Sequence, residues 1–292
     1  MSPDTLLLGV DGGGTHCRAR LCAADGTVLG EAVNGPANIR LGLDQSLASV
    51  VQAVRQCLAQ AGLTSHDLPR ITACLALAGA SEPNALAAAQ TRKFPFGQTI
   101  MTTDARAACI GAHGGKPGGV IIAGTGTIGW AEPGGRRVGG WGLPVSDEGS
   151  GAWIGCETLR RTLWAHDGRI SWTNLLHAVF ERFKRDPHAI VRFSSEALPR
   201  DFGALAPIVV EHAKQNDPAG VELMQAAGGH IDRLAERLMA LGVQKLVLMG
   251  GLAPTMVDWI APFTREHLVR PEGDALDGAL RLARSAADVV AA

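Results

Sequence analysis

The sequence lacks the features that mark nucleic-acid-binding and membrane-spanning proteins. Its 27 Lys and Arg residues nearly balance 28 Asp and Glu residues, and no basic block stands out. A clustered basic patch is the electrostatic signature of nucleic-acid binding, so we expect no nucleic-acid partner. No stretch approaches the roughly 18 consecutive apolar residues of a membrane-spanning helix. We therefore expect no membrane partner either.

Cysteine is scarce and scattered, and no two cysteines form a C-x-x-C pair. This spacing gives neither a zinc-ligand pattern nor a disulfide framework. Most of the cysteines lie in apolar surroundings, which is typical of reduced, buried thiols. The first residues, MSPDTLLLGVD, also lack the positive start and long apolar core of a signal peptide. We expect a cytoplasmic protein.

The chain has enough apolar residues, 46% of 292, to build two domains. Its first 112 residues predict three strands joined by tight turns, and then a helix from Asp44, as N-cap, to Gly62. Strands and helices alternate after that helix: strand 70–79, helix 84–92, strand 98–104 and helix 105–112. This order is an α/β pattern.

The glycine-rich segment 113–119 is the best candidate for a linker, and an apolar strand follows it at 119–124. Residues 149–242 are mainly helical in pattern, and their clearest helix begins at Asp217-Pro218, with Asp as the N-cap. A buried strand at 245–251, a helix from about Thr255, a short strand near 268–271 and a final amphipathic helix complete the chain.

Gly124, Gly126 and Gly129 match the G-x-G-x-x-G pattern of dinucleotide-binding proteins. That pattern needs a helix to begin at its third glycine, so that the helix N-terminus can carry the pyrophosphate. Pro133, Gly134 and Gly135 make such a helix costly, by about 3 kcal/mol for proline and about 1 kcal/mol for each glycine. The segment predicts strand, turn and strand instead, so we reject a nicotinamide cofactor.

The same glycine-rich turn occurs twice, because residues 11–15 align with residues 123–127 at an offset of 112. Glycine lets backbone N–H groups approach an anion, and a threonine hydroxyl adds a donor. Two such turns can hold the phosphates of ATP, and Asp11 supplies a carboxylate for Mg²⁺ where the second copy has Ala123. The candidate phosphate-binding residues are Gly12, Gly13, Gly14 and Thr15, with Gly124, Thr125, Gly126 and Thr127.

Taken together, these motifs resemble those of the actin/hexokinase/Hsp70-like ATPase superfamily. GVDGGGT is similar to its first phosphate motif, AGTGT to its second, and LMGG at 248–251 to its adenosine motif. TTDARAA resembles the segment that carries the catalytic aspartate, and GGWGLPVSDEGSGAWIG the sugar-binding stretch of N-acetylglucosamine kinases. Within the superfamily the chain resembles amino-sugar kinases of the BadF/BadG/BcrA/BcrD type.

The resemblance implies an α/β protein of two ribonuclease-H-like domains, with nucleotide and sugar in a cleft between them. Residues 1–115 and 275–292 would form the first domain, and residues 116–274 the second, with a helical insertion. Gly250 and Gly251 would approach the adenosine of ATP, although a plain turn at a strand end is the alternative. The resemblance also suggests a homodimer.

The resemblance assigns Asp104 as the general base that takes the proton from the sugar 6-hydroxyl. The alternative is simple helix capping by Asp104. Asp147 would contact a sugar hydroxyl or the 2-substituent, or else only form a turn or cap. Gly140 would bring backbone close to the sugar, and Trp141 would pack on the apolar face of the sugar ring. Asn38 would bind sugar hydroxyls, or else only cap its own loop.

The function implied is an ATP-dependent kinase for the 6-hydroxyl of glucosamine or N-acetylglucosamine. Trp141 favours the N-acetylglucosamine branch, whereas GSGAW and ALPRDFG resemble the glucosamine kinases. Two alternatives stay open within the fold: an ATPase activator of 2-hydroxyacyl-CoA dehydratases, which needs cysteine ligands for an iron–sulfur cluster, and a sugar-sensing module without catalysis.

Overall fold

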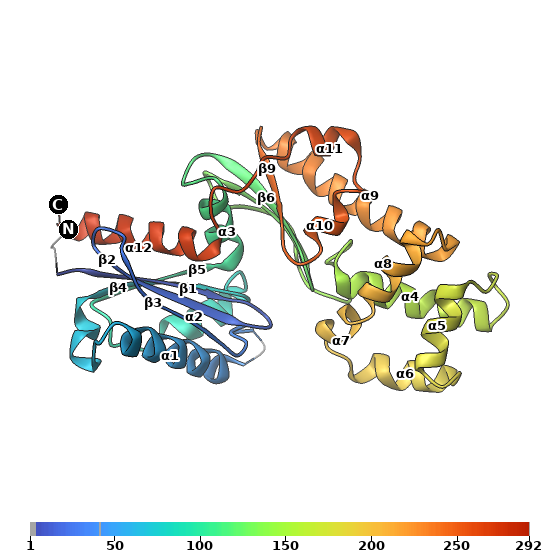
Figure 1. Ribbon diagram of the computed structural model, residues 1–292, viewed down its shortest axis with the longest axis horizontal. Coiled ribbons are helices and arrows are strands. Elements are labelled where there is room, and N and C mark those ends of the chain that lie inside the picture. Colours follow the sequence, from blue (N-terminus) through green and yellow to red (C-terminus); the bar gives the residue numbers. More distant parts are fainter. Residues whose placement is uncertain (1–3, 41, 292) are drawn as a thin grey trace. The chain divides into compact units, whose positions relative to one another are not determined.

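The computed structural model describes residues 4–40 and 42–291, which form two compact units (Figure 1). Unit 1 holds the chain up to Gly118, the segment Ala131–Gly135 and the chain from Arg270 onward. Unit 2 holds Gly119–Trp130 and Arg136–Val269. The chain thus first passes from unit 1 to unit 2 inside the glycine-rich segment 113–119. Unit 1 also includes the turn at 131–135 and residues 270–274, both of which we expected in the second domain from the sequence.

Unit 1 contains a five-stranded sheet in the order β3-β2-β1-β4-β5. The first three strands form the predicted antiparallel meander, whereas β4 and β5 run parallel to β1. The strands are β1 Leu6–Gly12, β2 Cys17–Ala23, β3 Val28–Asn34, β4 Ile71–Leu77 and β5 Gln98–Thr103. The alternating sequence of β2 explains its burial, since Cys17, Ala19 and Leu21 face the core.

Helices cover both faces of this sheet, α1 and α2 on one face and α3 and α12 on the other (Figure 1). Asp44 is not the N-cap that we predicted for the first helix. Gly42 occupies that position, and the Asp44 carboxylate, inside the first turn, accepts a hydrogen bond from Arg92 at 2.6 Å. The helices are α1 Leu43–Gln60, α2 Pro83–Gln90, α3 Asp104–Ala112 and α12 Ala275–Ala291, with a 3₁₀ turn η1 at Ser65–Arg70.

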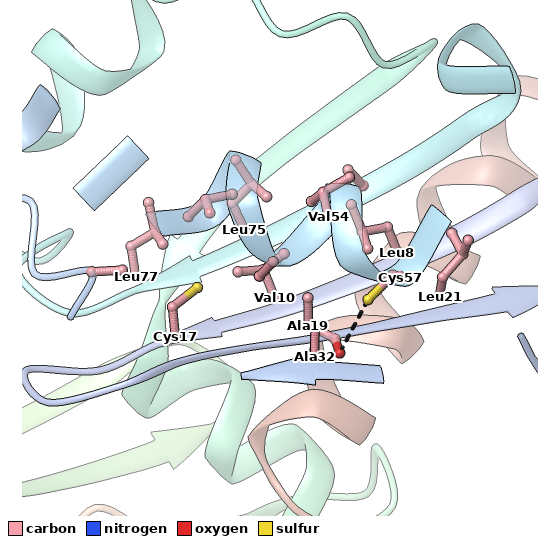
Figure 2. Packing of buried hydrophobic residues seen from close by; sticks show 14 of the residues in the cluster. Leu8, Val10, Cys17, Ala19, Leu21, Ala32, Val54, Cys57, Leu75 and Leu77 are labelled. Atoms are coloured by element: carbon pink, nitrogen blue, oxygen red, sulfur yellow. Dashed lines mark hydrogen bonds between the residues drawn. The ribbon is translucent and has the colours of Figure 1, made fainter. Parts of the chain in front are cut away.

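The core beneath α1 contains cysteines as ordinary apolar residues. Figure 2 shows Val54 and Cys57 of α1 packed against side chains of the strands, and the Cys57 thiol donates to the Ala19 carbonyl at 3.6 Å. Burial raises the pKa of Cys57 to about 11 and those of Cys17 and Cys74 to about 12, so these thiols are protonated at neutral pH. The prediction of buried thiols is confirmed for five of the six cysteines, since Cys156 is half-buried.

Unit 2 contains a four-stranded sheet in the order β8-β7-β6-β9. Strand β6 runs parallel to β9, and the long helix α9 packs on the sheet through Leu234 and Leu238. The segment after Gly129 continues as strand, turn and strand, which confirms the rejection of the dinucleotide-binding helix. The strands are β6 Gly118–Ala123, β7 Thr127–Glu132, β8 Arg136–Gly139 and β9 Leu246–Met249.

The other helices of unit 2 follow the predicted helical region. Asp217 caps α9 as expected, its carboxylate accepting the Gly220 N–H at 3.1 Å. The helix expected from about Thr255 starts at Ala253 and ends at Met256, and the strand expected near 268 is an isolated bridge between Leu246 and Leu268. The helices are α4 Gly151–His166, α5 Asn174–Arg182, α6 Pro187–Glu196, α7 Pro199–Gly203, α8 Ala206–Lys214, α9 Pro218–Ala240, α10 Ala253–Met256 and α11 Pro262–Glu266. Among the helices of the described residues, none combines the length and apolarity that crossing a bilayer requires.

Candidate active site

The predicted site residues of unit 1 gather at one edge of its sheet. Strands β1, β4 and β5 are parallel, and Gly12, Leu77 and Thr103 form one row across them. The glycine turn that follows β1 and the Asp104 that follows β5 therefore leave the sheet at the same carboxyl edge. Asn38 joins them, since it bridges to Ala78 directly after β4. Ligands of α/β proteins bind at such an edge.

The first glycine turn combines close packing with open backbone. A Cβ on Gly12 would lie 2.6 Å from the Leu77 side chain, so this glycine is required by packing. The backbone of Gly13 is held by the His16 carbonyl at 2.8 Å and by the Ala37 N–H at 2.9 Å. Gly14 and Thr15 are exposed, and a Cβ on Gly14 would meet no atom within 4 Å. The tip of the turn is thus accessible to an anion.

Asp11 forms an ion pair with Arg18 on the neighbouring strand β2. The Arg18 Nε and Nη2 donate to Asp11 Oδ2 at 3.1 and 2.7 Å, and Nη1 donates to Asp274 Oδ2 at 2.7 Å. Asp274 begins the last helix, where its carboxylate accepts the N–H groups of Leu276 and Asp277. One guanidinium thus connects the first glycine turn with the start of α12.

The two carboxylates that share Arg18 have pKa values shifted in opposite directions. Burial raises the pKa of Asp11 above its usual value, although Arg18 acts to lower it. Burial also acts to raise the pKa of Asp274, but the Asp277 N–H and Arg18 outweigh it, and that pKa is lowered. The difference arises because backbone donors stabilise the charge of Asp274.

Asp104 occupies the first position of α3, with Thr103 before it. The Thr103 hydroxyl accepts the Arg106 N–H at 3.1 Å and is the N-cap, so the capping alternative for Asp104 is wrong. Asp104 Oδ1 accepts the N–H of the next residue, Ala105, at 2.9 Å. The carboxylate is half-buried at the carboxyl edge of the sheet. A general base needs this kind of fixed, accessible position.

Asn38 partly fulfils its alternative role, because its side-chain oxygen accepts the Arg40 N–H at 3.1 Å. A Cβ on Gly79 would lie 2.6 Å from the same oxygen, so Gly79 leaves room for the amide. Within the described residues, the Asn38 amide nitrogen donates to no protein group. This nitrogen is the part of Asn38 that suits a ligand hydroxyl.

The second glycine turn, in unit 2, is held mainly through its carbonyl groups. The Gly124 and Thr125 carbonyls accept the Gly151 and Ala152 N–H groups, at 2.8 and 3.2 Å, from the first turn of α4. The hydroxyl of Thr127 is buried and has no hydrogen-bond partner among the described residues. A buried, unpaired hydroxyl is rare in folded proteins, and it fits a turn that takes a phosphate as a further partner.

Asp147 lies beside this second turn. A Cβ on Gly126 would lie 2.5 Å from Asp147 Oδ2, and Asp147 Oδ1 accepts the Gly142 N–H at 3.0 Å. The backbone of Asp147 has a φ of 67°, uncommon for a residue other than glycine. The cap of α4 is Ser150, not Asp147. Asp147 thus links the second glycine turn with the loop of Gly140 and Trp141.

Gly250 and Gly251 follow β9 in unit 2, next to the second turn. Gly250 has a φ of 96°, and a Cβ there would lie 2.3 Å from the Ala123 carbonyl oxygen, so only glycine fits. Gly251 is exposed, and a Cβ there would meet nothing within 4 Å. In this pair, Gly250 has no room for a side chain and Gly251 has open space around it, as Gly12 and Gly14 do in unit 1.

The model of the BadF/BadG/BcrA/BcrD ATPase family matches residues 8–282, nearly the whole chain. The chain belongs to this ATPase family. The match includes both glycine turns, Asp104, Asp147 and the Gly250-Gly251 pair.

One curated relative and two solved structures show which kinds of protein the chain is similar to. Glucosamine kinase GspK of Vibrio cholerae is 41% identical over 278 residues, which cover 94% of this chain and 95% of the relative. A Chromobacterium violaceum structure assigned as an N-acetylglucosamine kinase superposes with a TM-score of 0.90 at 35% identity, covering 96% of this chain and all of that one. A ROK family glucokinase of Streptomyces griseus, at 16% identity and a TM-score of 0.55 over 96% of this chain and 99% of that one, shares the fold. The fold is the two-domain ribonuclease-H-like fold that the sequence predicted.

Sequence reasoning missed Arg18, Thr103 and Ser150. Arg18 was detectable in principle, since β1 and β2 pair with Asp11 opposite Arg18, and opposite charges facing each other across strands attract. Thr103 and Ser150 are common N-cap residues, but each stands close to an aspartate that also suits a cap.

Proposed function

We propose that this chain is an ATP-dependent kinase that phosphorylates the 6-hydroxyl of glucosamine or N-acetylglucosamine. The observation that carries the proposal is the carboxyl edge of the unit 1 sheet, where Thr103, directly before Asp104, shares a row with Gly12, the residue after Asp11. A base beside a phosphate-binding turn is the arrangement that phosphoryl transfer requires. The two kinase relatives support amino sugars as the substrate class.

Asp104 is the proposed catalytic base. Its carboxylate accepts the proton of the sugar 6-hydroxyl while that oxygen forms a bond to the γ-phosphorus, and the bond from the γ-phosphorus to the ADP oxygen breaks. Asn38, on the same edge, is proposed to orient the sugar through its amide. In unit 2, the Asp147 carboxylate is proposed to bind a sugar hydroxyl or the 2-substituent, with Gly140 and Trp141 against the sugar ring.

The phosphates of ATP are proposed to bind the exposed backbone of Gly14 and Thr15 in unit 1, next to Gly13, whose own N–H is held by the His16 carbonyl. In unit 2, the backbone of Gly124, Thr125 and Gly126 and the Thr127 hydroxyl are proposed to bind phosphate, and Gly250 and Gly251 to lie against the adenosine. Each turn has open backbone, and the Thr127 hydroxyl lacks a protein partner in the described structure.

Asp11 is the proposed carboxylate for Mg²⁺. In proteins Mg²⁺ keeps several of its waters and binds phosphate oxygens of the substrate, so one or two protein carboxylates suffice. Arg18 occupies Oδ2 of Asp11, whereas Oδ1 has no partner among the described residues. When bound, Mg²⁺ would neutralise charge on the β- and γ-phosphates.

The activator of 2-hydroxyacyl-CoA dehydratases is disfavoured by the cysteines. A bridging iron–sulfur cluster needs accessible thiolates. Five of the six cysteines are buried, and Cys156 lies half-buried on α4. A colourless purified protein is the expected result, whereas a brown protein with a charge-transfer band would favour the activator.

An ADP-release assay over four sugars tests the proposed function. We expect turnover with glucosamine or N-acetylglucosamine well above that with glucose or mannosamine. Equal turnover with all four sugars, or ADP release that no sugar stimulates, would contradict it. Such a kinase uses cytoplasmic ATP, so we place the reaction in the cytoplasm. The homodimer stays a prediction, which light scattering can check.

A further inference from the structure

Arg137, on β8 of unit 2, makes three contacts with the loop that follows it. Its Nε donates to the Gly139 carbonyl at 2.8 Å, and its Nη2 donates to the Gly140 carbonyl. The guanidinium carbon also lies 3.9 Å from the ring centroid of Trp141. One planar group therefore binds two consecutive carbonyls and covers part of the next side chain.

The loop needs such support, because its backbone is intrinsically flexible. Gly139, Gly140 and Gly142 all have positive φ, at 66°, 71° and 97°. Glycine loses more conformational freedom on folding than any other residue, so a run of glycines keeps one conformation only when other contacts hold it. The far side of the loop is held by the Trp141 N–H on the Ser146 hydroxyl, at 3.3 Å, and by Asp147. Arg137 holds the near side.

Trp141 is 65% exposed although it is a large apolar ring. An exposed indole in contact with a guanidinium has a fixed orientation, because the cation is attracted to the ring face and is held itself by the two carbonyls. Lysine cannot reproduce this arrangement, since it has no planar fork that binds two carbonyls while stacking on a ring. The exposed remainder of the ring is available for a ligand.

We infer that Arg137 is a positioning residue for sugar binding, which holds Trp141 as a platform for the apolar face of the sugar. The inference rests on the proposed function, in which Trp141 packs on the sugar. Arg137 is not among the residues proposed to bind the reacting oxygen or the phosphates. Its loss should therefore weaken sugar binding and leave the chemical step largely intact.

Arg137→Gln tests the inference, and Arg136→Gln is its matched control, because Arg136 is the exposed neighbour on the same strand. We expect the KM for the sugar to rise about tenfold in Arg137→Gln, with kcat and the KM for ATP within about twofold. Arg137→Lys keeps the charge without the fork and should show a smaller rise, about threefold. An unchanged sugar KM in Arg137→Gln, or an equal rise in Arg136→Gln, would overturn the inference.

A measurement without substrate separates this inference from the proposed function. The fluorescence of Trp141 is obtained by subtracting the tryptophan emission of the Trp141→Phe counterpart from that of each protein. We expect acrylamide to quench that difference signal more strongly in Arg137→Gln than in the parent protein, because the ring loses its cover. Equal quenching would refute the positioning role even in an active kinase. Stronger quenching in a protein that phosphorylates no amino sugar would refute only the proposed function. If Arg137→Gln fails to fold, Arg137→Lys carries both measurements.

Discussion

The two glycine-rich turns have the same sequence pattern and the same place between two strands, yet they are stabilised differently. The first turn, after β1, has a charged neighbour, since Asp11 is bound by Arg18 at 2.7 Å. The second turn, after β6, has Ala123 in that place, fully buried, and its backbone is bound by N–H groups of α4 and by Leu252. The two copies of the turn thus differ: the copy in unit 1 lies beside a charged ion pair, whereas the copy in unit 2 has a neutral neighbour and is held by backbone hydrogen bonds.

This difference indicates a division of chemical roles. In unit 1, Asp11 near the end of β1 and Asp104 directly after the parallel strand β5 lie at one sheet edge, where a metal carboxylate and a base are proposed. In unit 2, the buried Thr127 hydroxyl and Asp147 lie around a turn without a metal carboxylate. Substitutions in the two units should therefore change different kinetic constants.

The largest effect is expected from Asp104→Asn. Loss of a general base typically costs 10²–10⁴ in rate, so we expect kcat to fall about a thousandfold while the KM for ATP and the melting temperature stay near those of the parent. Asp44→Asn is the control, because it makes the same chemical change in the same unit at an exposed ion pair. Steady-state kinetics measure both. Turnover in Asp104→Asn within tenfold of the parent would place the base elsewhere.

Asp11→Asn is expected to lower kcat less, by about a hundredfold, because the amide retains shape but provides no anionic ligand for Mg²⁺. The Mg²⁺ concentration needed for half-maximal rate should rise as well. The matched control is Asp274→Asn, which changes the other partner of Arg18. An Asp11→Asn enzyme with unaltered Mg²⁺ dependence would show that the charged neighbour of the first turn is not the metal carboxylate.

The sequence predicted most elements because their periodicity is strong. The meander of unit 1 and the helix that Asp217 caps lie within a few residues of their predicted limits. Helix starts were harder, since neighbouring residues compete for one cap position. Thr103 has an extended backbone, with φ of −79° and ψ of 148°, so its hydroxyl reaches the Arg106 N–H and Asp104 enters the helix.

The candidate site was predictable only where it consists of motifs. The glycine turns, Asp104 and Asp147 were found from local sequence and family resemblance. Arg18 was not, because its role needs the strand register that places it opposite Asp11 and a contact with Asp274, 256 residues away. Arg137 was also missed, since the stacking on Trp141 depends on three positive φ angles that sequence alone does not give.

In unit 2, Gly126→Ala should weaken the binding of the sugar, through Asp147, and of ATP, through the turn itself, rather than slow turnover. The added Cβ would lie 2.5 Å from Asp147 Oδ2, so the carboxylate that also binds the Gly142 N–H must move. We expect the KM for the sugar to rise about tenfold, equivalent to about 1.4 kcal/mol of binding. Gly229→Ala in α9 is the control, because a Cβ there meets nothing within 4 Å. A fall in kcat with a constant sugar KM would contradict the division of roles.

The smallest effect concerns stability and follows from the raised pKa of Asp11. Burial is the main cause of that shift, so the folded state binds the proton of Asp11 more tightly than the unfolded state does. The Asp11 charge therefore reduces stability as pH rises above the ordinary pKa of 3.8. Asp11→Asn should melt higher than the parent at pH 7, and the gap should shrink towards pH 4.

Asp274→Asn should show the opposite sign, although it shares the same guanidinium. The pKa of Asp274 is lowered, so its charge stabilises the folded state above the ordinary pKa and this contribution is lost as pH falls through the lowered value. Asp274→Asn should therefore melt lower than the parent at pH 7, with a gap that narrows towards pH 4. Calorimetry at both pH values measures the two variants. A stabilising gap for Asp11→Asn that grows towards pH 4 would mean that Arg18 outweighs burial. In that case the charge of Asp11 would not reduce the stability of the folded state, and the first turn would lose no stability by having an aspartate where the second turn has Ala123.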